Sequence, residues 1–203
     1  MANPTGAFGL KPLRHRSGAP WNGQVVECYV SASYATALYI GDPVIVTPTL
    51  AEKDATARRL TINKSAGTAG ILVRGVIVGF EPLKTDLTKI YNPASTERIA
   101  YVVMDPDVVF AIRGNGYAAL TSNVVGQNAV MIAKTAGSTV TGLSGMALDE
   151  GTTTAPNTTQ NFTLHVVGIQ PKDDNELAAS MVYEVLLNTC ENATGRFLGI
   201  TAS

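Results

Sequence analysis

The chain has 203 residues, of which 45% are hydrophobic and 15% are charged, and its formal net charge is −1 at pH 7. A hydrophobic fraction of this size excludes a disordered chain, and the length suffices for one substantial core. The balanced charge disfavours nucleic acid as the main partner, because phosphate binding needs a basic field. Charged residues fall well below the usual quarter of a chain, which fits a surface that packs against other proteins.

The first residues contain no apolar signal core, and the chain has no run of eighteen apolar residues. We therefore expect neither a secretory signal nor a membrane span. Cys28 and Cys190 are the only cysteines, which is too few for a disulfide framework and fits synthesis in a cytoplasm. A single bridge between them stays open.

Residues 1–23 form a segment unlike the rest, rich in glycine and proline and without a helical or strand period. Such a segment cannot bury a core of its own. We predict an extended arm that becomes ordered on a neighbouring chain, followed by a single β-rich body over residues 24–203. Removal of residues 1–21 is then expected to leave a folded body. The arm residues expected to bind a partner are apolar or basic: Phe8, Leu10, Lys11, Arg14, Arg16 and Trp21.

Several strands are predicted in the first half of the body. Gln24–Ser31 alternates apolar and polar positions, and Ala37–Thr47 is a second strand region with a tight turn or bulge at Gly41-Asp42-Pro43. Pro48–Gly70 concentrates charge and is predicted to be a loop. Ile71–Phe80 is almost entirely apolar and β-branched, so we expect a deeply buried strand.

The longest strand signal is Ile99–Gly116, where valine, isoleucine, tyrosine and phenylalanine dominate. Pro106 interrupts this run, and a proline cannot donate a hydrogen bond to a strand ladder. Asp105 and Asp107 on either side favour a turn or bulge. We predict one long strand, bent at Pro106, through the middle of an antiparallel structure.

The second half of the chain continues the β pattern. Tyr117–Asn128 is ambiguous between a short helix and an irregular crossover, whereas Ala129–Lys134, Asn161–Gln170 and Met181–Asn188 are predicted strands. No sustained amphipathic helix occurs. The predicted fold class is all-β, a mainly antiparallel β-sandwich or barrel with an extended N-terminal arm and little helix.

The sequence offers no pattern typical of a catalytic, cofactor-binding or metal site. The only histidines are His15, in the arm, and His165, in a predicted strand, and no GxSxG motif occurs. Zinc-type Cys and His spacings are absent, and the acidic clusters around Pro106 and at Asp173–Glu176 do not follow a calcium-loop spacing. We therefore expect that the chain is not an enzyme and uses no cofactor or metal.

Several stretches nevertheless resemble one family. These are the opening MANPTGAFGLKPLRHRSGAPWNG, GDPVIVTPT from Gly41, YVVMDPDVVFAIRGNG from Tyr101 and GIQPKDDNELAASMVYEVLLN from Gly168. Together they resemble the capsid cement or decoration proteins of tailed bacteriophages. The resemblance implies a β-rich virion protein, made in the host cytoplasm, that binds the outer surface of the major capsid protein shell and stabilises it without chemistry.

The partners implied are the major capsid protein and neighbouring copies of this chain in a dimer or trimer, with no direct nucleic acid and no membrane. Two other virion roles stay open: a tail or head-completion protein, and a carbohydrate-binding β module. The module is disfavoured because only 6% of the residues are aromatic and the single Trp lies in the arm. A hydrolase with His165 as its base is the third hypothesis.

Overall fold

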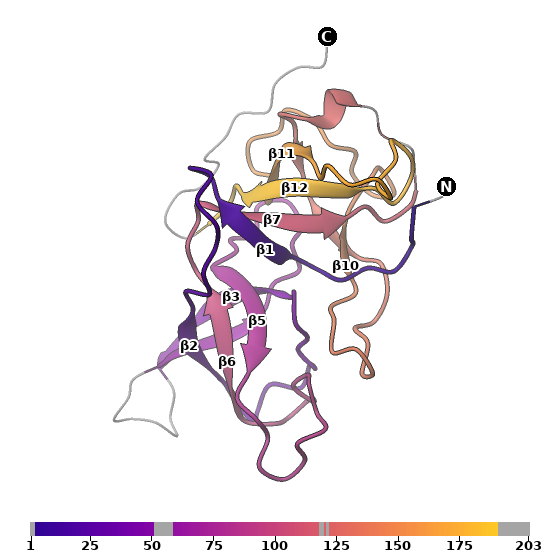
Figure 1. Ribbon diagram of the computed structural model, residues 1–203. Coiled ribbons are helices and arrows are strands. Elements are labelled where there is room, and N and C mark those ends of the chain that lie inside the picture. Colours follow the sequence, from indigo (N-terminus) through magenta and orange to yellow (C-terminus); the bar gives the residue numbers. More distant parts are fainter. Residues whose placement is uncertain (1–2, 51–58, 118–119, 121, 191–203) are drawn as a thin grey trace.

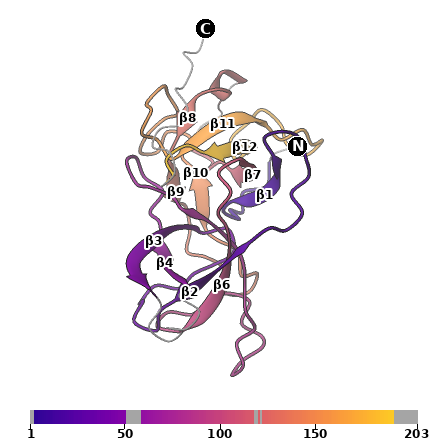
Figure 2. The ribbon, with the colours of Figure 1, turned by 90° about the vertical axis from the view of Figure 1, so that its left-hand side faces the viewer.

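The computed structural model describes residues 3–50, 59–117, 120 and 122–190. It is all-β, as predicted, and its strands form two units placed end to end (Figure 1). In this part of the chain the one helical segment is a single 3-10 turn, η1 at Ser122–Val124. Figure 2 shows the same two units from the side, with the barrel below and the open sheet above.

The first unit is a closed five-stranded barrel in the order β2-β4-β3-β5-β6. Its strands are β2 (Val26–Val30), β3 (Pro43–Leu50), β4 (Leu60–Lys64), β5 (Gly75–Phe80) and β6 (Arg98–Val103). Most neighbours pair antiparallel, and one parallel contact, with Tyr29 opposite Thr61, joins β2 to β4. Closure leaves this unit without a free sheet edge.

The second unit is built around an open five-stranded sheet in the order β1-β7-β12-β11-β8. Its strands are β1 (Lys11–His15), β7 (Val108–Arg113), β12 (Val182–Leu187), β11 (Leu164–Ile169) and β8 (Asn128–Ala129). A two-stranded ribbon, β9 (Met131–Ala133) with β10 (Met146–Leu148), lies beside it. Every pairing in the sheet is antiparallel.

Pro106 marks the junction between the two units. The single long strand predicted over 99–116 is instead two strands, β6 in the barrel and β7 in the sheet. The Asp105 side chain accepts a hydrogen bond of 2.8 Å from the backbone N–H of Asp107, which forms a local turn around the proline. The two halves of the run thus belong to different sheets because neither the proline nor this turn can continue a ladder.

Other boundaries also differ from the sequence prediction. The charged stretch predicted as a loop over 48–70 contains β4, whose pairing with β3 and β2 completes the barrel. The strand predicted from Ile71 begins at Gly75, and Ile71 and Leu72 are exposed. Residues 51–58 and 191–203 of the predicted body lie outside the described residues.

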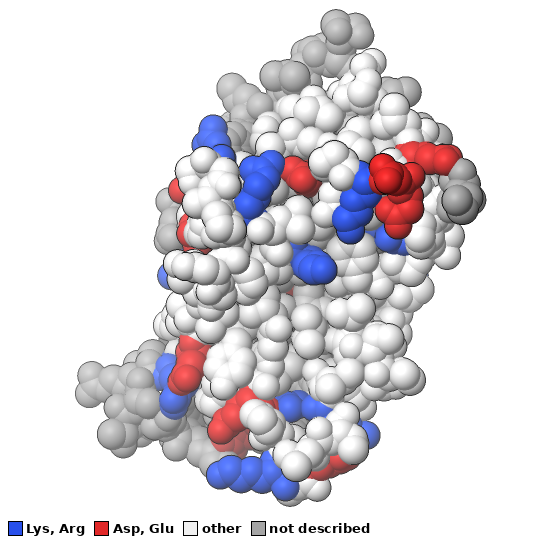
Figure 3. Space-filling view, viewed as in Figure 1, with Lys and Arg blue, Asp and Glu red and all other residues white. Residues whose placement is uncertain are grey.

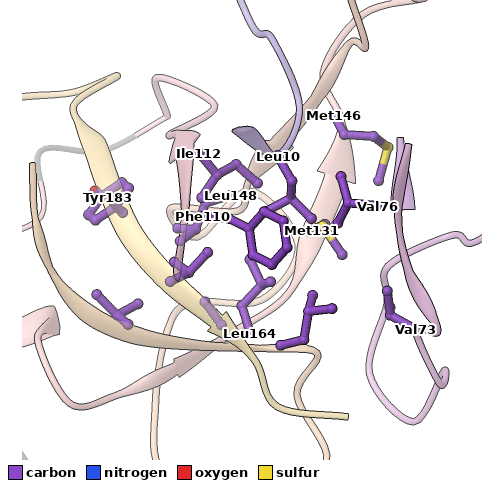
Figure 4. Packing of buried hydrophobic residues seen from close by; sticks show 14 of the residues in the cluster. Leu10, Val73, Val76, Phe110, Ile112, Met131, Met146, Leu148, Leu164 and Tyr183 are labelled. Carbon is purple, nitrogen blue, oxygen red and sulfur yellow. The ribbon is translucent and has the colours of Figure 1, made fainter. Parts of the chain in front are cut away.

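Each unit has its own apolar core. The barrel core holds small and aliphatic side chains: Cys28, Val30, Leu38, Val44, Ile62, Ile77, Ala100 and Val102. The larger core of the second unit includes Phe110, Tyr183 and Leu164 (Figure 4). Three valines in or beside the barrel strands β5 and β6 also belong to it: Val73, Val76 and Val103. Shared packing therefore joins the units. Cys28 and Cys190 are both buried and form no disulfide with each other.

Candidate functional site: a groove lined by the N-terminal arm

The arm lies on the body of its own chain. Strand β1 pairs with β7, with Lys11 opposite Ala111 and His15 opposite Val108. Ahead of β1, the Asn3 side chain donates to the carbonyl oxygen of Glu176 at 2.9 Å and accepts from the backbone N–H of the same residue. Lys134 Nζ donates to the Thr5 carbonyl at 2.8 Å. The arm is thus attached along its length and supplies the edge strand of the sheet.

Two glycines allow the arm to cross the barrel closely. Gly9 and Gly41 have φ angles of +72° and +90°, in the region that side-chain-bearing residues rarely adopt. A Cβ at Gly9 would lie 2.4 Å from the Gly41 carbonyl oxygen, and one at Gly41 would lie 2.5 Å from that of Phe8. Beside this crossing, the Leu10 N–H donates to the Gly41 carbonyl at 2.9 Å. The contact fixes where Phe8 and Leu10 sit.

The outer edge of β1 offers few free backbone groups to a further strand. Pro12 has no N–H to offer. The His15 N–H donates to the Ala19 carbonyl at 2.8 Å, and Arg14 forms a bridge with Pro20, so a short hairpin covers the C-terminal end of the edge. A partner that approaches here therefore meets side chains rather than an open backbone ladder.

A groove of about 720 Å³ lies where the arm, the barrel and the sheet meet. The arm contributes Phe8, Leu10, Lys11, Pro12, Leu13, Trp21 and Gly23. The remaining lining residues are Val25, Ile40, Val78, Gly79, Tyr101, Ala111, Arg113, Leu143, Gln170, Lys172 and Val182. In Figure 3 white, uncharged residues fill most of the band between the upper and lower groups of charged side chains, with a Lys or Arg side chain at its centre. The volume falls within the range of typical ligand sites, about 300–1,000 Å³.

Arg113 joins the arm to the sheet within the groove wall. Its Nη1 donates to the Pro4 carbonyl, and its guanidinium carbon lies 5.5 Å from the centre of the Phe8 ring. Burial lowers the pKa of Arg113, an effect that the charge of Asp174 partly offsets. Arg113 Nε and Trp21 Nε1 are shielded from solvent and have no hydrogen-bond partner among the described residues. Both atoms are donors that an acceptor could satisfy.

Four of the six arm residues expected to bind a partner line this groove: Phe8, Leu10, Lys11 and Trp21. Leu10 is buried in the core of the second unit, so it supports the wall rather than presenting a surface. Arg14 is committed elsewhere, since its Nη2 donates to Glu184 Oε2 at 2.7 Å. The Arg16 N–H donates to the Asp107 carbonyl at 2.7 Å, and this residue is not part of the groove lining. Binding by any of the six stays a prediction.

Nothing in the sequence marked the body residues of the groove as members of a binding site. Val78, Tyr101, Leu143 and Lys172 come from four separate segments, and only the tertiary fold brings them to one place. Tyr101 and Val78 lie in strands that were predicted, but their orientation toward the arm could not be read from a two-residue period alone.

A buried acidic pair, Asp149 and Glu150, lies apart from the groove lining. Burial raises the pKa of Asp149, but the backbone N–H groups of residues 151–154 donate to its carboxylate and lower the pKa on balance. Burial raises the pKa of Glu150, which accepts from Tyr183 Oη at 2.9 Å and from the Gly116 N–H at 2.7 Å. Both carboxylates are thereby occupied in holding loops.

The histidines and acidic clusters offer little else for chemistry. His165 Nδ1 lies 2.8 Å from Asn128 Oδ1, and burial followed by the charge of Arg16 lowers the pKa of His165. Across the residues that the structure describes, no group of three His, Cys, Asp or Glu side chains could hold a metal ion. The same residues include no helix of the length and apolarity that a membrane crossing requires.

Comparison with known proteins adds no relative. No protein-family model matches the chain. A search of curated proteins also found no match. No solved structure matches it. The groove and its chemistry therefore carry the functional argument, together with the sequence resemblance described above.

Proposed function

We propose that the chain is a structural protein of a tailed-phage virion, a cement or decoration protein that binds the outer surface of the major capsid protein shell and stabilises it. The sequence resemblance, which spans most of the chain, suggests the family. The low content of charged residues fits a protein that works by packing against others.

One structural observation supports the proposal most directly: the groove, whose lining residues are mostly apolar. Exposed apolar surface of this kind is typical of protein interaction sites. Val25 and Leu143, both in the groove lining, are exposed by 40% and 36%. A capsid presents the same surface many times, so a protein that binds only the assembled shell stabilises it by mass action.

Neighbouring copies are the second proposed partner. Symmetric dimers and trimers are common solutions for proteins that bridge symmetry-related subunits, and they multiply modest contacts. Mass measurement of the purified protein and of decorated shells gives the copy number in each state. A tail or head-completion role would instead give few copies per virion.

The decisive experiment adds the purified protein to expanded, DNA-free heads of the phage that carries the gene. We expect saturable binding at on the order of hundreds of copies per head, as repeated lattice sites imply, and a higher melting temperature of the shell. No binding, with few copies in purified virions, would favour the tail or head-completion role. Glycan-array binding without shell binding would favour the carbohydrate-binding module.

Point variants test the face better than removal of the arm, since β1 and Leu10 belong to the folded sheet. The double variant Val25→Ser/Leu143→Ser should weaken shell binding several-fold, because it removes exposed apolar contacts at the groove. Leu87→Ser is the matched control, since Leu87 is 76% exposed and outside the groove lining. If only the control variant loses binding, another face contacts the shell.

A further inference from the structure

The groove has an uneven charge. Among its lining residues are three cations, Lys11, Arg113 and Lys172, and no carboxylate. The whole chain is balanced, with 15 Lys and Arg against 16 Asp and Glu. The positive side chains therefore gather at an apolar surface whose chemistry differs from the rest of the molecule.

Two of the three cations are available to a partner. Lys11 and Lys172 are exposed, and neither forms an ion pair within the described part of the chain. Arg113 is already held by the Pro4 carbonyl and the Phe8 ring, so it positions the wall. The groove thus offers an apolar floor with two free ammonium groups at its margin.

We propose that this groove binds a short segment of a partner protein that carries apolar side chains together with carboxylates. The inference rests on the proposed function in taking the partner to be a protein, and it adds the chemistry of the segment. Apolar side chains would bury against Val78, Leu13 and Val182, and carboxylates would meet Lys11 and Lys172.

The fold also defines how the segment is recognised. Pro12 has no N–H, and the hairpin over residues 15–20 pairs with Arg14 and His15, so β1 offers few free backbone groups to which a further strand could bind. Side-chain contacts must supply the specificity. A nucleic acid does not fit, because two free cations over an apolar floor cannot neutralise a phosphate backbone.

The experiment uses Trp21, the only tryptophan of the chain, as a reporter inside the groove. A library of random dodecapeptides is selected on the full-length protein, and the enriched peptides are synthesised and titrated while Trp21 fluorescence is measured. We expect enriched peptides to combine apolar residues with Asp or Glu and to shift the fluorescence saturably. Higher salt should weaken their binding.

Charge reversal at the two free cations provides the matched comparison. In Lys11→Glu/Lys172→Glu the affinity for the same peptides should fall at least about tenfold, which corresponds to about 1.4 kcal/mol. Lys84→Glu, at an exposed lysine outside the groove lining, should bind as the unaltered protein does. Circular dichroism confirms that all variants fold.

Three results would overturn the inference: enrichment of cationic or purely polar peptides, equal binding by the charge-reversed variant, or binding without a change in Trp21 fluorescence. The shell assay separates this from the proposed function. Shell binding that is unaffected by Lys11→Glu/Lys172→Glu would reject the groove inference and keep the capsid role. Peptide binding without shell binding would keep the groove inference and reject the capsid role.

Discussion

The barrel and the open sheet pair their strands in different ways. All barrel strands come from one continuous stretch, residues 26–103, and closure pairs both edges of every strand. The sheet collects its strands from distant segments, between residues 11 and 187, and the N-terminal arm supplies one edge. The groove lies where the barrel and the sheet meet. The candidate binding surface is therefore formed by residues that are far apart in the sequence.

The cores of the two units also differ in the residues that compose them. The barrel core consists of small and aliphatic residues, whereas the sheet core includes Phe110, Tyr183 and several methionines. Methionine adapts to irregular spaces, and an open sheet covered by loops has a less regular interior than a closed barrel. We therefore expect the sheet unit to depend more on single large side chains.

The largest effect is expected for Phe110→Ala. Phe110 is fully buried at the centre of the sheet core (Figure 4), and loss of such a ring costs about 3–5 kcal/mol. Urea unfolding measures the loss, and amide hydrogen exchange should accelerate in β7 and β12 before the barrel strands. Equal acceleration in both units would show that they unfold as one and that the contrast drawn above does not extend to stability.

Leu10→Ala tests how firmly the arm is held. Leu10 is buried in the sheet core, so truncation should cost about 2–4 kcal/mol and expose β1 and β7 to exchange first. A shift in Trp21 fluorescence should accompany the loss. Leu13→Ala, in the half-buried next apolar position of the arm, serves as control and should cost less. Equal losses at both positions would contradict a specific anchoring role for Leu10.

Glu150 should make the sheet unit sensitive to pH. Its folded-state pKa is raised above the ordinary value of 4.5, so its contribution to stability is present below that pH and is lost as pH rises through the raised pKa. In Glu150→Gln the stability should no longer fall as pH rises through this range, because a glutamine has no charge to gain. It can accept from the Gly116 N–H and donate to Tyr183 Oη. Glu150→Ala should cost about 1–3 kcal/mol by leaving buried donors unpaired.

Asp149 serves as a control, because its expected effect on stability has the opposite pH dependence. Its pKa is lowered, so its stabilising contribution is present above the ordinary value of 3.8 and disappears as pH falls through the lowered pKa. Urea unfolding of Glu150→Gln, Asp149→Asn and the unaltered protein between pH 3 and pH 8 compares them. Parallel pH profiles for all three would show that neither carboxylate governs the dependence.

The smallest effect is expected for the ion pair of Arg14 with Glu184, which connects β1 to β12 across the sheet. The Arg14 side chain is 36% exposed, and pairs of this kind contribute about 0–1 kcal/mol. A double-mutant cycle with Arg14→Met and Glu184→Gln measures the coupling energy. A coupling well above this range would mean that charge, and not only Leu10, holds the arm.

The sequence was sufficient for the fold class but not for the arrangement of strands. Val, Ile and Phe patterns located β6, β7, β11 and β12, because period-two alternation and β-branched side chains are local signals. The assignment of β6 and β7 to different sheets depends on which distant strands pair with them. Strand β4 was missed because polar and charged residues surround it, and pairing on both sides determines its conformation.

Only part of the candidate site could be predicted from the sequence. Phe8, Lys11 and Trp21 stood out because apolar and basic residues are unusual in a Gly- and Pro-rich segment. Lys172 and Val78 did not, because each is ordinary in its own segment and becomes part of a site through tertiary contact. The burial of Leu10 likewise depends on Gly9 and Gly41 allowing two backbones to approach closely.

The pairing of β1 with β7 also sets an order of events during synthesis. Lys11 faces Ala111, a residue made about one hundred positions later, whereas the barrel strands are complete by residue 103. At typical translation speeds this delay is roughly 5–20 s. Most of that interval passes while the barrel strands are being made, and Phe8 and Leu10 have no partner strand β7 to pack beside until it ends. Strand β1 can therefore pair with β7 only after the last barrel strand has been made, and a nearby nascent copy could compete for it in the meantime.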